Sequence, residues 1–261
     1  MDLKLNDKGV VVLASSKGLG KACVREFARE GARVMLTGRT EDTLKQAASE
    51  IQAETSQEVF WKVCDVTKPT EINALIEAAK KKLGRIDVLV TNTGGPPAGT
   101  FDSMKDEDWQ LGFDLVLMSM IRAIRAALPE LKKNGGRIVN IASSSVKEPV
   151  DNLILSNTFR MGIAGLAKTL AAEFGPDGIL INTVGPGRIA TDRTKHLDEK
   201  KAAQAGRSFE QVREENTAVI PAGRYGTPEE FAKQVVFLGS WANTYVTGQT
   251  LLVEGGMIKA Y

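Results

Sequence analysis

The chain has 261 residues, 43% of them hydrophobic and 25% charged, which are ordinary proportions for a globular protein with room for one large domain. Lys and Arg number 34 against 32 Asp and Glu, so the net charge of +2 favours neither nucleic acid nor an acidic membrane surface as a partner. The sequence has no apolar leader and no run approaching the ~18 apolar residues of a spanning helix, and a cytoplasmic location is therefore expected.

Residue counts also argue against metal and disulfide chemistry. Cys23 and Cys64 are too few and too isolated for a disulfide framework or a zinc site, so we expect both to be small core residues. His196 is the only histidine, which excludes a His-rich metal site and leaves no Ser-His-Asp triad. No bound metal is predicted.

Seven short apolar runs alternate with segments of helical periodicity. Such runs are typical of strands covered on both faces, and helices of ten or more residues between them predict right-handed crossovers and a parallel sheet. We predict an α/β fold for residues 1–261, a single Rossmann-type domain whose doubly wound parallel sheet of about seven strands has helices on both faces. The runs are Val10–Leu13, Val34–Leu36, Val59–Val63, Val88–Val90, Ile138–Ile141, Ile179–Ile181 and Leu251–Val253.

A glycine-rich turn from Ala14 to Gly20 follows the first strand and opens a helix near Lys21. Close glycine spacing lets backbone amides at a helix N-terminus approach a pyrophosphate, where the helix dipole favours negative charge. A turn that only connects strand to helix is the alternative. The strand before it and the helix after it favour nucleotide binding.

The end of the second strand bears on the choice of nucleotide. Gly38 stands where a carboxylate would hydrogen-bond the ribose of NAD, and Arg39 follows it. Arg39 can hold a 2′-phosphate bidentately, and Lys17 in the glycine-rich turn offers a second cation. Either residue alone is more often a solvated charge, but the pair favours NADP(H).

Residues 188–219 interrupt the pattern of strands and helices. Pro186 and Gly187 close the sixth strand, and the following stretch is polar, charged and short of strand periodicity. Because ligands of open α/β sheets lie beyond the carboxyl ends of the strands, this segment is predicted to form a lid over the substrate. The alternative is a solvated loop without a gating role.

Ordered motifs along almost the whole chain resemble those of the short-chain dehydrogenase/reductase family, and the pattern is most similar to its 3-oxoacyl-carrier-protein reductase-like branch. Leu13 and Ala14 replace the Thr and the first Gly of the family's glycine-rich turn. The extra methyl group of Ala14 is expected to be tolerated, and the alternative is that it crowds the turn or shifts the diphosphate. The other matching segments are Cys64–Val66, Thr91–Gly94, Val184–Thr191, Gly223–Glu230, Thr247–Gln249 and Glu254–Gly256.

The resemblance implies which residues contact the cofactor. Cys64–Val66 corresponds to the adenine contact, Thr91–Gly94 to a segment beside the cofactor, and Val184–Thr191 to the Pro-Gly loop at the nicotinamide. The implied cofactor-binding residues are Ala14, Ser16, Lys17, Gly18, Leu19, Gly20, Arg39, Asp65, Val66, Asn92, Gly94, Arg160, Pro186, Gly187, Ile189 and Thr191.

The catalytic positions depart from the family pattern. In the family, a Ser after the fifth strand is followed thirteen positions later by the Tyr of a Tyr-x-x-x-Lys pair. The segment Gly136–Ser143 resembles that strand and its Ser, and an ungapped count then reaches Ser156 and Arg160 in place of Tyr and Lys. Aligning Trp109 with the family's Trp also puts Val116 in place of the supporting Asn.

Two classes of function are compatible with these residues. In the first, an NADP(H)-dependent oxidoreductase acts on the carbonyl/hydroxyl pair of a small molecule: Ser143, Ser156 and Arg160 stabilise an oxyanion, and water delivers the proton. Within this class, Arg160 can instead grip an anionic substrate. The second class is an NADP(H)-binding sensor or scaffold with little or no turnover. Retention of Ser143 and of the paired cations favours the enzyme.

Three other residues are candidates for the site. Asp114 is more simply a capped or interface carboxylate, and His196 a surface residue of the predicted lid. Tyr261 offers a phenol that a neighbouring subunit could supply, because the family resemblance implies a homotetramer or homodimer. Packing is expected through the helices around residues 106–131 and 152–174, where small apolar residues allow close approach.

Overall fold

The structure, a computed structural model, describes residues 1–260 and is built on one parallel sheet of seven strands in the order β3-β2-β1-β4-β5-β6-β7. The order reverses between β1 and β4, as in a doubly wound Rossmann-type sheet, so the predicted fold class is confirmed. The strands are β1 Gly9–Val12, β2 Arg33–Gly38, β3 Val59–Val63, β4 Val88–Thr91, β5 Arg137–Ile141, β6 Leu180–Pro186 and β7 Thr250–Val253.

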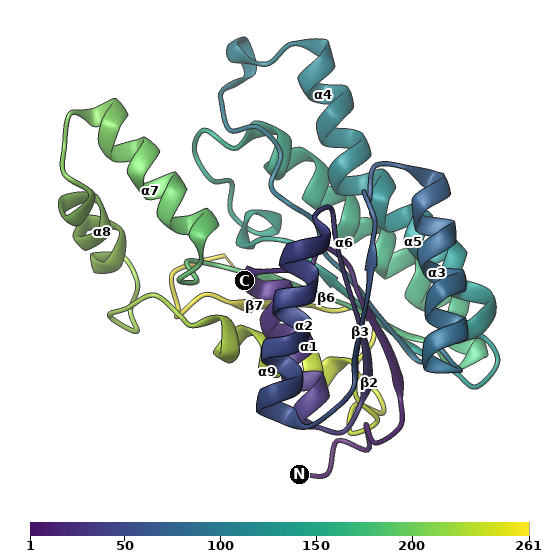
Figure 1. Ribbon diagram of the computed structural model, residues 1–261. Helices are drawn as coiled ribbons and strands as arrows, with labels where there is room; N and C mark the ends of the chain where they lie inside the picture. Colours follow the sequence, from purple (N-terminus) through teal and green to yellow (C-terminus); the bar gives the residue numbers. More distant parts are fainter. Residues whose placement is uncertain (261) are drawn as a thin grey trace.

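Helices cover both faces of this sheet (Figure 1). Alternate residues of β1 and the residue after it show why: Val10 and Val12 belong to one buried hydrophobic cluster, whereas Val11 and Leu13 belong to another on the opposite face. The helices are α1 Gly18–Arg29, α2 Glu41–Thr55, α3 Pro69–Leu83, α4 Asp106–Gly112, α5 Ser119–Leu131, α6 Ile154–Phe174, α7 Asp192–Ala205, α8 Phe209–Ala218 and α9 Pro228–Leu238. None of the helices in residues 1–260 is long and apolar enough to cross a membrane.

A π-helical segment, Phe113–Met118, joins α4 to α5 without a break. It carries Val116, which is fully buried against Met120 and Ile163. An extra residue in a helical turn changes the direction in which side chains point, and such segments are common near functional sites. Here the side chain at the turn is apolar.

The predicted lid consists of two helices, α7 and α8, which lie apart from the sheet in Figure 1. A buried polar cluster fixes their base. Asp198 of α7 accepts hydrogen bonds from Tyr225 Oη at 2.8 Å, from Asn216 Nδ2 of α8 at 2.8 Å and from Arg188 Nη1 at 3.0 Å. The carboxylate thus ties both lid helices to the loops that enter and leave them.

Candidate active site

The turn after β1 has the shape expected of a diphosphate cradle. Ala14 adopts a left-handed conformation with φ 45°, and Gly18 follows with φ 57°. At Gly20, a Cβ atom would lie 2.7 Å from the carbonyl oxygen of Ala14, so only glycine allows the helix to begin this close to the turn. Asn92 Nδ2 holds the same carbonyl oxygen at 3.0 Å, which connects the turn to the end of β4.

The carboxyl end of β2 carries no acidic side chain. Gly38 lies beside Ser16, because a Cβ on Gly38 would meet Ser16 Oγ at 3.1 Å. Arg39 and Lys17 are both exposed next to this contact. Asp65, after β3, accepts hydrogen bonds from the backbone and hydroxyl of Thr67. Partial burial raises the pKa of Asp65, but these bonds and the charges of Lys68 and Arg39 outweigh it, so the net pKa is lowered.

The Pro-Gly loop after β6 returns to the glycine-rich turn. Pro186 ends the strand beside Val253, and Gly187 packs so closely on Glu254 that a Cβ would lie 2.4 Å from the Cβ of that residue. Ile189 is buried, and Thr191 caps α7 by accepting a hydrogen bond from Thr194 N. A methyl carbon of Thr191 lies 3.9 Å from where a Cβ of Gly18 would be.

A dinucleotide fits this line of residues. Gly20 leaves room only for backbone, and nothing lies within 4 Å of a Cβ position on Gly94. The buried hydroxyl of Thr93 has no hydrogen-bond partner among the described residues, so it can serve a ligand at the end of β4. Leu19 and Val66 pack with the hydrophobic clusters on the two faces of the sheet.

Ser156 and Arg160 contact each other in the structure, whereas Ser143 lies two residues after Ile141, whose carbonyl oxygen Arg160 contacts. Arg160 Nε donates to Ser156 Oγ at 3.2 Å, and its Nη1 donates to the carbonyl oxygen of Ile141 at 3.0 Å. Ile141 ends β5, two residues before Ser143. Ser143 Oγ accepts a hydrogen bond from Ser145 N at 3.1 Å. All three side chains therefore sit at the carboxyl end of β5 and the first turns of α6.

Arg160 is an unusual cation because only 7% of it is exposed. Burial, followed by repulsion from Arg193, lowers the pKa of Arg160 to about 10. The side chain still carries its charge at neutral pH. It forms no ion pair with any residue from 1 to 260, so its charge is met only by neutral oxygens.

Other residues weighed from the sequence lie outside this cluster. Asp114 bonds Arg122 Nη2 at 2.9 Å and Gln110 Nε2 at 2.7 Å, so it belongs to a surface network. His196 is exposed on α7. Cys23 and Cys64 are buried and unpaired, and burial raises the pKa of both thiols. Tyr261 lies outside the described residues.

Sequence reasoning missed Arg193, which belongs to the first turn of α7. Its Nη2 donates to the carbonyl oxygen of Pro96 at 3.3 Å, and the guanidinium packs on Gly95. The polar lid sequence gave no indication that one of its cations reaches the end of β4. The one available signal was the position of Arg193, directly after the Pro-Gly loop.

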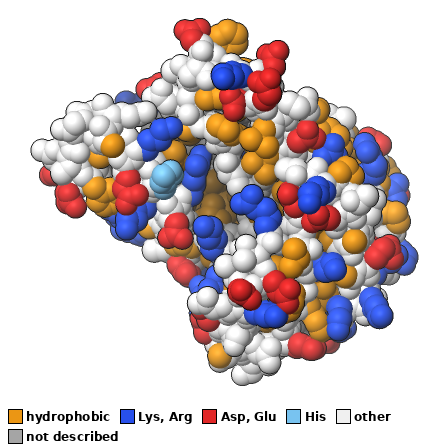
Figure 2. Space-filling model, turned by 45° about the horizontal axis from the view of Figure 1, so that its top comes forward, with side chains coloured by type: hydrophobic (Ala, Val, Ile, Leu, Met, Phe, Trp, Pro, Cys, Tyr) orange, Lys and Arg blue, Asp and Glu red, His pale blue; other side chains and the backbone are white. Residues whose placement is uncertain are grey.

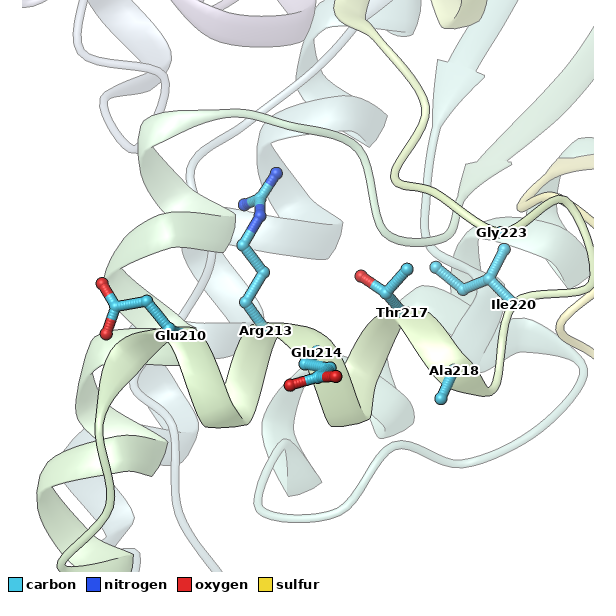
Figure 3. A pocket seen from close by; sticks show the side chains of 7 residues that line it. All are labelled: Glu210, Arg213, Glu214, Thr217, Ala218, Ile220 and Gly223. Carbon is cyan, nitrogen blue, oxygen red and sulfur yellow. The ribbon is translucent and has the colours of Figure 1, made fainter.

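The cavities on the lid do not include the Ser143 cluster. One of about 510 Å³ lies along α8, and Figure 3 shows its wall to be one side of that helix and the loop after it. Arg213 lines this cavity and also a second one of about 330 Å³ that reaches Thr191 and Asp192. Arg213 stacks on the ring of Tyr225 at 4.5 Å, so it strengthens the base of the lid.

Comparison with known proteins assigns the family. Residues 13–258 match the family model described as enoyl-(acyl carrier protein) reductase. The chain is 34% identical to the 3-oxoacyl-[acyl-carrier-protein] reductase FabG of Vibrio cholerae, over 98% of this chain and 99% of that protein. The protein belongs to the short-chain dehydrogenase/reductase family of oxidoreductases, and it is similar to that family's ketoacyl reductases.

Solved structures with the same fold carry NADPH. L-sorbose reductase from Gluconobacter frateurii, complexed with NADPH and L-sorbose, matches with a TM-score of 0.95 at 30% identity, over the whole of both chains. An NADPH-bound short-chain oxidoreductase from Pseudomonas aeruginosa, described as containing an atypical catalytic center, matches with a TM-score of 0.89 at 30% identity, over 99% of this chain and 100% of that one.

Proposed function

We propose that this protein is an NADP(H)-dependent reductase of a small carbonyl compound that works without a catalytic tyrosine. The observation that carries the proposal is the buried contact between Arg160 and Ser156 at the end of β5, next to Ser143. NADP(H) as cofactor is supported by the NADPH-bound structural relatives and by the lack of a carboxylate at Gly38. The P. aeruginosa relative supports the idea that an altered centre can accompany bound NADPH.

Bound NADPH supplies the hydride, which the carbonyl carbon accepts while its oxygen takes up a proton, giving an alcohol and NADP⁺. The hydroxyls of Ser143 and Ser156 are suited to bind that oxygen. Each already accepts a hydrogen bond, from Ser145 N and Arg160 Nε respectively, so each keeps its own hydrogen to donate. Donation from a cation makes Ser156 the stronger donor.

Arg160 stabilises the negative charge that develops on the oxygen, because a fixed cation in a water-poor site acts strongly. It is a poor acid, since its pKa of about 10 keeps it protonated at neutral pH. An aliphatic hydroxyl is a poor acid as well. We therefore assign the proton to water, and we expect activated carbonyls, which need little acid assistance, to be the substrates.

The proposal also covers the lid, the domain organisation and the assembly. Residues 188–219 act as a lid over the substrate, hinged at the Asp198 cluster, and the whole chain is one domain. Assembly into a homodimer or homotetramer is supported by exposed apolar side chains on the expected helices, Leu111 on α4 at 47% and Met161 on α6 at 52%. Light scattering with size-exclusion chromatography tests the assembly.

The function is tested by following NADPH oxidation at 340 nm with activated ketones, aldehydes, quinones and 3-oxoacyl thioesters, and by identifying the alcohol product. Ser143→Ala and Ser156→Ala are each expected to lower kcat by about 10- to 100-fold through loss of one donor. Tight NADPH binding without oxidation by any of these compounds would favour a sensor or scaffold instead.

A further inference from the structure

Burial lowers the pKa of Arg160, and the charge of Arg193, a residue of α7, acts on Arg160 and contributes to that lowering. The guanidinium of Arg193 lies against Gly95, where an added Cβ would be 2.7 Å from Nη2, and the same atom donates to the carbonyl oxygen of Pro96. The loop that carries Gly95 and Pro96 continues to Gly99, whose carbonyl oxygen accepts a hydrogen bond from Ile154 N at the start of α6 at 3.3 Å. Arg193 is thus docked on the loop between β4 and α4, and this loop contacts the start of the helix that carries Ser156 and Arg160.

Both guanidinium groups have binding capacity left over. Arg160 uses Nε and Nη1, and its Nη2 makes no hydrogen bond with residues 1–260. Arg193 makes one bond of 3.3 Å to a neutral carbonyl. Neither side chain forms an ion pair with the described part of the chain. Arg160 is buried, whereas Arg193 is exposed. A buried charge such as that of Arg160 costs several kcal/mol without a counter-ion, and a ligand that brings the opposite charge recovers part of that cost.

The face of the molecule toward the lid shows the same excess of positive charge. Figure 2 shows a hollow between the lobe formed by the lid and the body, with Lys and Arg side chains on its rim and hydrophobic side chains deeper in. Lys200 of α7 also donates to this loop, from Nζ to the carbonyl oxygen of Ala98 at 3.5 Å. The one carboxylate buried in the lid, that of Asp198, is already held by Arg188, Tyr225 and Asn216.

We propose that Arg160 and Arg193 together bind an anionic group of the substrate, so that the protein reduces a carbonyl compound carrying a carboxylate or a phosphate. The inference rests on the proposed function, because the anion is placed beside the hydroxyls of Ser143 and Ser156. Guanidinium groups bind carboxylate and phosphate oxygens bidentately, which fixes the orientation of the carbonyl as well as the affinity. The lid arginine also couples substrate binding to lid position.

The cofactor's diphosphate is the other anion available to Arg193. The structure gives the diphosphate its own cradle, in the amides at the start of α1 and in Thr191, whose methyl group lies beside Gly18. Arg193 instead contacts Gly95 and Pro96 in the loop after β4. We therefore assign Arg193 to the substrate, and the experiment separates the two anions.

Matched pairs of ligands test the proposal by calorimetry on the NADP⁺ complex, which cannot turn over. The pairs are pyruvate and methyl pyruvate, 4-oxopentanoate and its methyl ester, and dihydroxyacetone phosphate and dihydroxyacetone. We expect at least one anion to bind about tenfold more tightly than its neutral partner, with about a threefold preference or less left in Arg193→Ala. Lys200→Ala is the control, because it also removes a lid cation that contacts the loop, and it should keep the preference.

Three results would overturn the proposal: no anion binding more tightly than its neutral partner, a preference that survives in Arg193→Ala, or a loss of NADP⁺ affinity in Arg193→Ala as large as the loss for the anion. The last would make Arg193 a diphosphate contact. A preference for anions without any NADPH oxidation would leave the anion site of Arg160 and Arg193 standing and would refute the proposed function, since the titration needs no turnover. If NADP⁺ does not bind, the same titration is made on the protein alone.

Discussion

Arg160 Nε donates to Ser156 Oγ at 3.2 Å, so the two residues that the family resemblance aligns with the Lys and Tyr of the catalytic pair contact each other directly. In place of a phenol beside an amine, the site has a hydroxyl beside a buried guanidinium. Such a pair can stabilise an oxyanion strongly, but it cannot donate a proton easily. The chemistry expected of this protein follows from that exchange.

Substitutions of Arg160 should separate the effect of its charge from the effect of its forked hydrogen bonds. Arg160→Lys keeps a positive charge but loses the fork that joins Ser156 Oγ to the Ile141 carbonyl, so kcat is expected to fall by about tenfold. Arg160→Ala removes charge and fork together, and a fall of about 100-fold or more is expected. Steady-state kinetics at saturating NADPH measure both. Equal activity of the lysine variant and the wild-type protein would show that the fork has no catalytic role.

The left-handed Ala14 should make the glycine-rich turn less stable than it could be. A β-carbon at φ 45° destabilises the folded state by roughly 1–2 kcal/mol, and Ala14→Gly removes this strain. The greater conformational entropy of glycine in the unfolded chain offsets about 0.5–1 kcal/mol of that gain. Ala14→Gly should therefore raise Tm by about 1–4 °C. Thermal unfolding followed by circular dichroism measures this. Ala74→Gly, the same change at an exposed position inside α3, should lower Tm instead.

Arg39 should distinguish the two nicotinamide cofactors. A bidentate guanidinium contact to the 2′-phosphate predicts that Arg39→Ala weakens NADPH binding by about 10- to 100-fold and leaves NADH binding nearly unchanged. Calorimetry with both cofactors gives the ratio. Arg125→Ala is the control, because it removes an exposed arginine from α5 and not from the end of β2, and it should change neither affinity. Equal loss for NADH and NADPH would place Arg39 away from the phosphate.

The pH profile should lack the ionisation of a catalytic acid. Burial and the charge of Arg193 bring the pKa of Arg160 to about 10, so its positive charge is constant at neutral pH and is lost only as the pH rises through that value. We expect kcat to vary by less than about threefold between about pH 6 and about pH 9, then to fall. A break inside that window would reveal a titrating acid that the account does not contain.

Loosening the base of the lid should be visible as faster proteolysis. Tyr225→Phe removes the hydrogen bond to the buried Asp198 carboxylate, at a cost of about 1–3 kcal/mol. Trypsin should then cut faster at lid sites such as Arg207. Tyr245→Phe, at a tyrosine that is 95% exposed, is the control and should leave the digestion unchanged. Unchanged digestion in the Tyr225 variant would mean that the cluster does not fix the lid.

Much of the sheet could be predicted because its strands are apolar on both faces. β6 shows the limit: the apolar run ends at Ile181, but the strand continues to Pro186 through Asn182 and Thr183. Asn182 is buried because its side chain bonds the backbone of Val246 and Gln249, which lie more than sixty residues away. Sequence periodicity carries no signal for such long-range partners.

The lid and its arginine were harder to predict for related reasons. Residues 188–219 are polar on most faces, so α7 and α8 lack a clear apolar stripe, and only their N-caps, Thr191 and Ser208, mark where they begin. The positions of Ser156 and Arg160 could be counted from Ser143 by family resemblance. The approach of Arg193 to Gly95 could not, because almost a hundred residues separate them and the contact depends on how the lid docks.

Isotope transfer from the cofactor tests whether the protein reduces a carbonyl compound without a catalytic tyrosine. Carbonyl compounds are incubated with NADPH carrying two deuterium atoms at C4 of the nicotinamide, so that deuteride is transferred from either face, and the alcohol is examined by mass spectrometry. We expect one deuterium at the former carbonyl carbon of the alcohol made by the wild-type protein. In Arg160→Ala at saturating cofactor, the alcohol should form more slowly by about 100-fold or more. Saturated NADPH binding with no deuterium in any product would contradict the proposed function and point to a protein that binds the cofactor without using it.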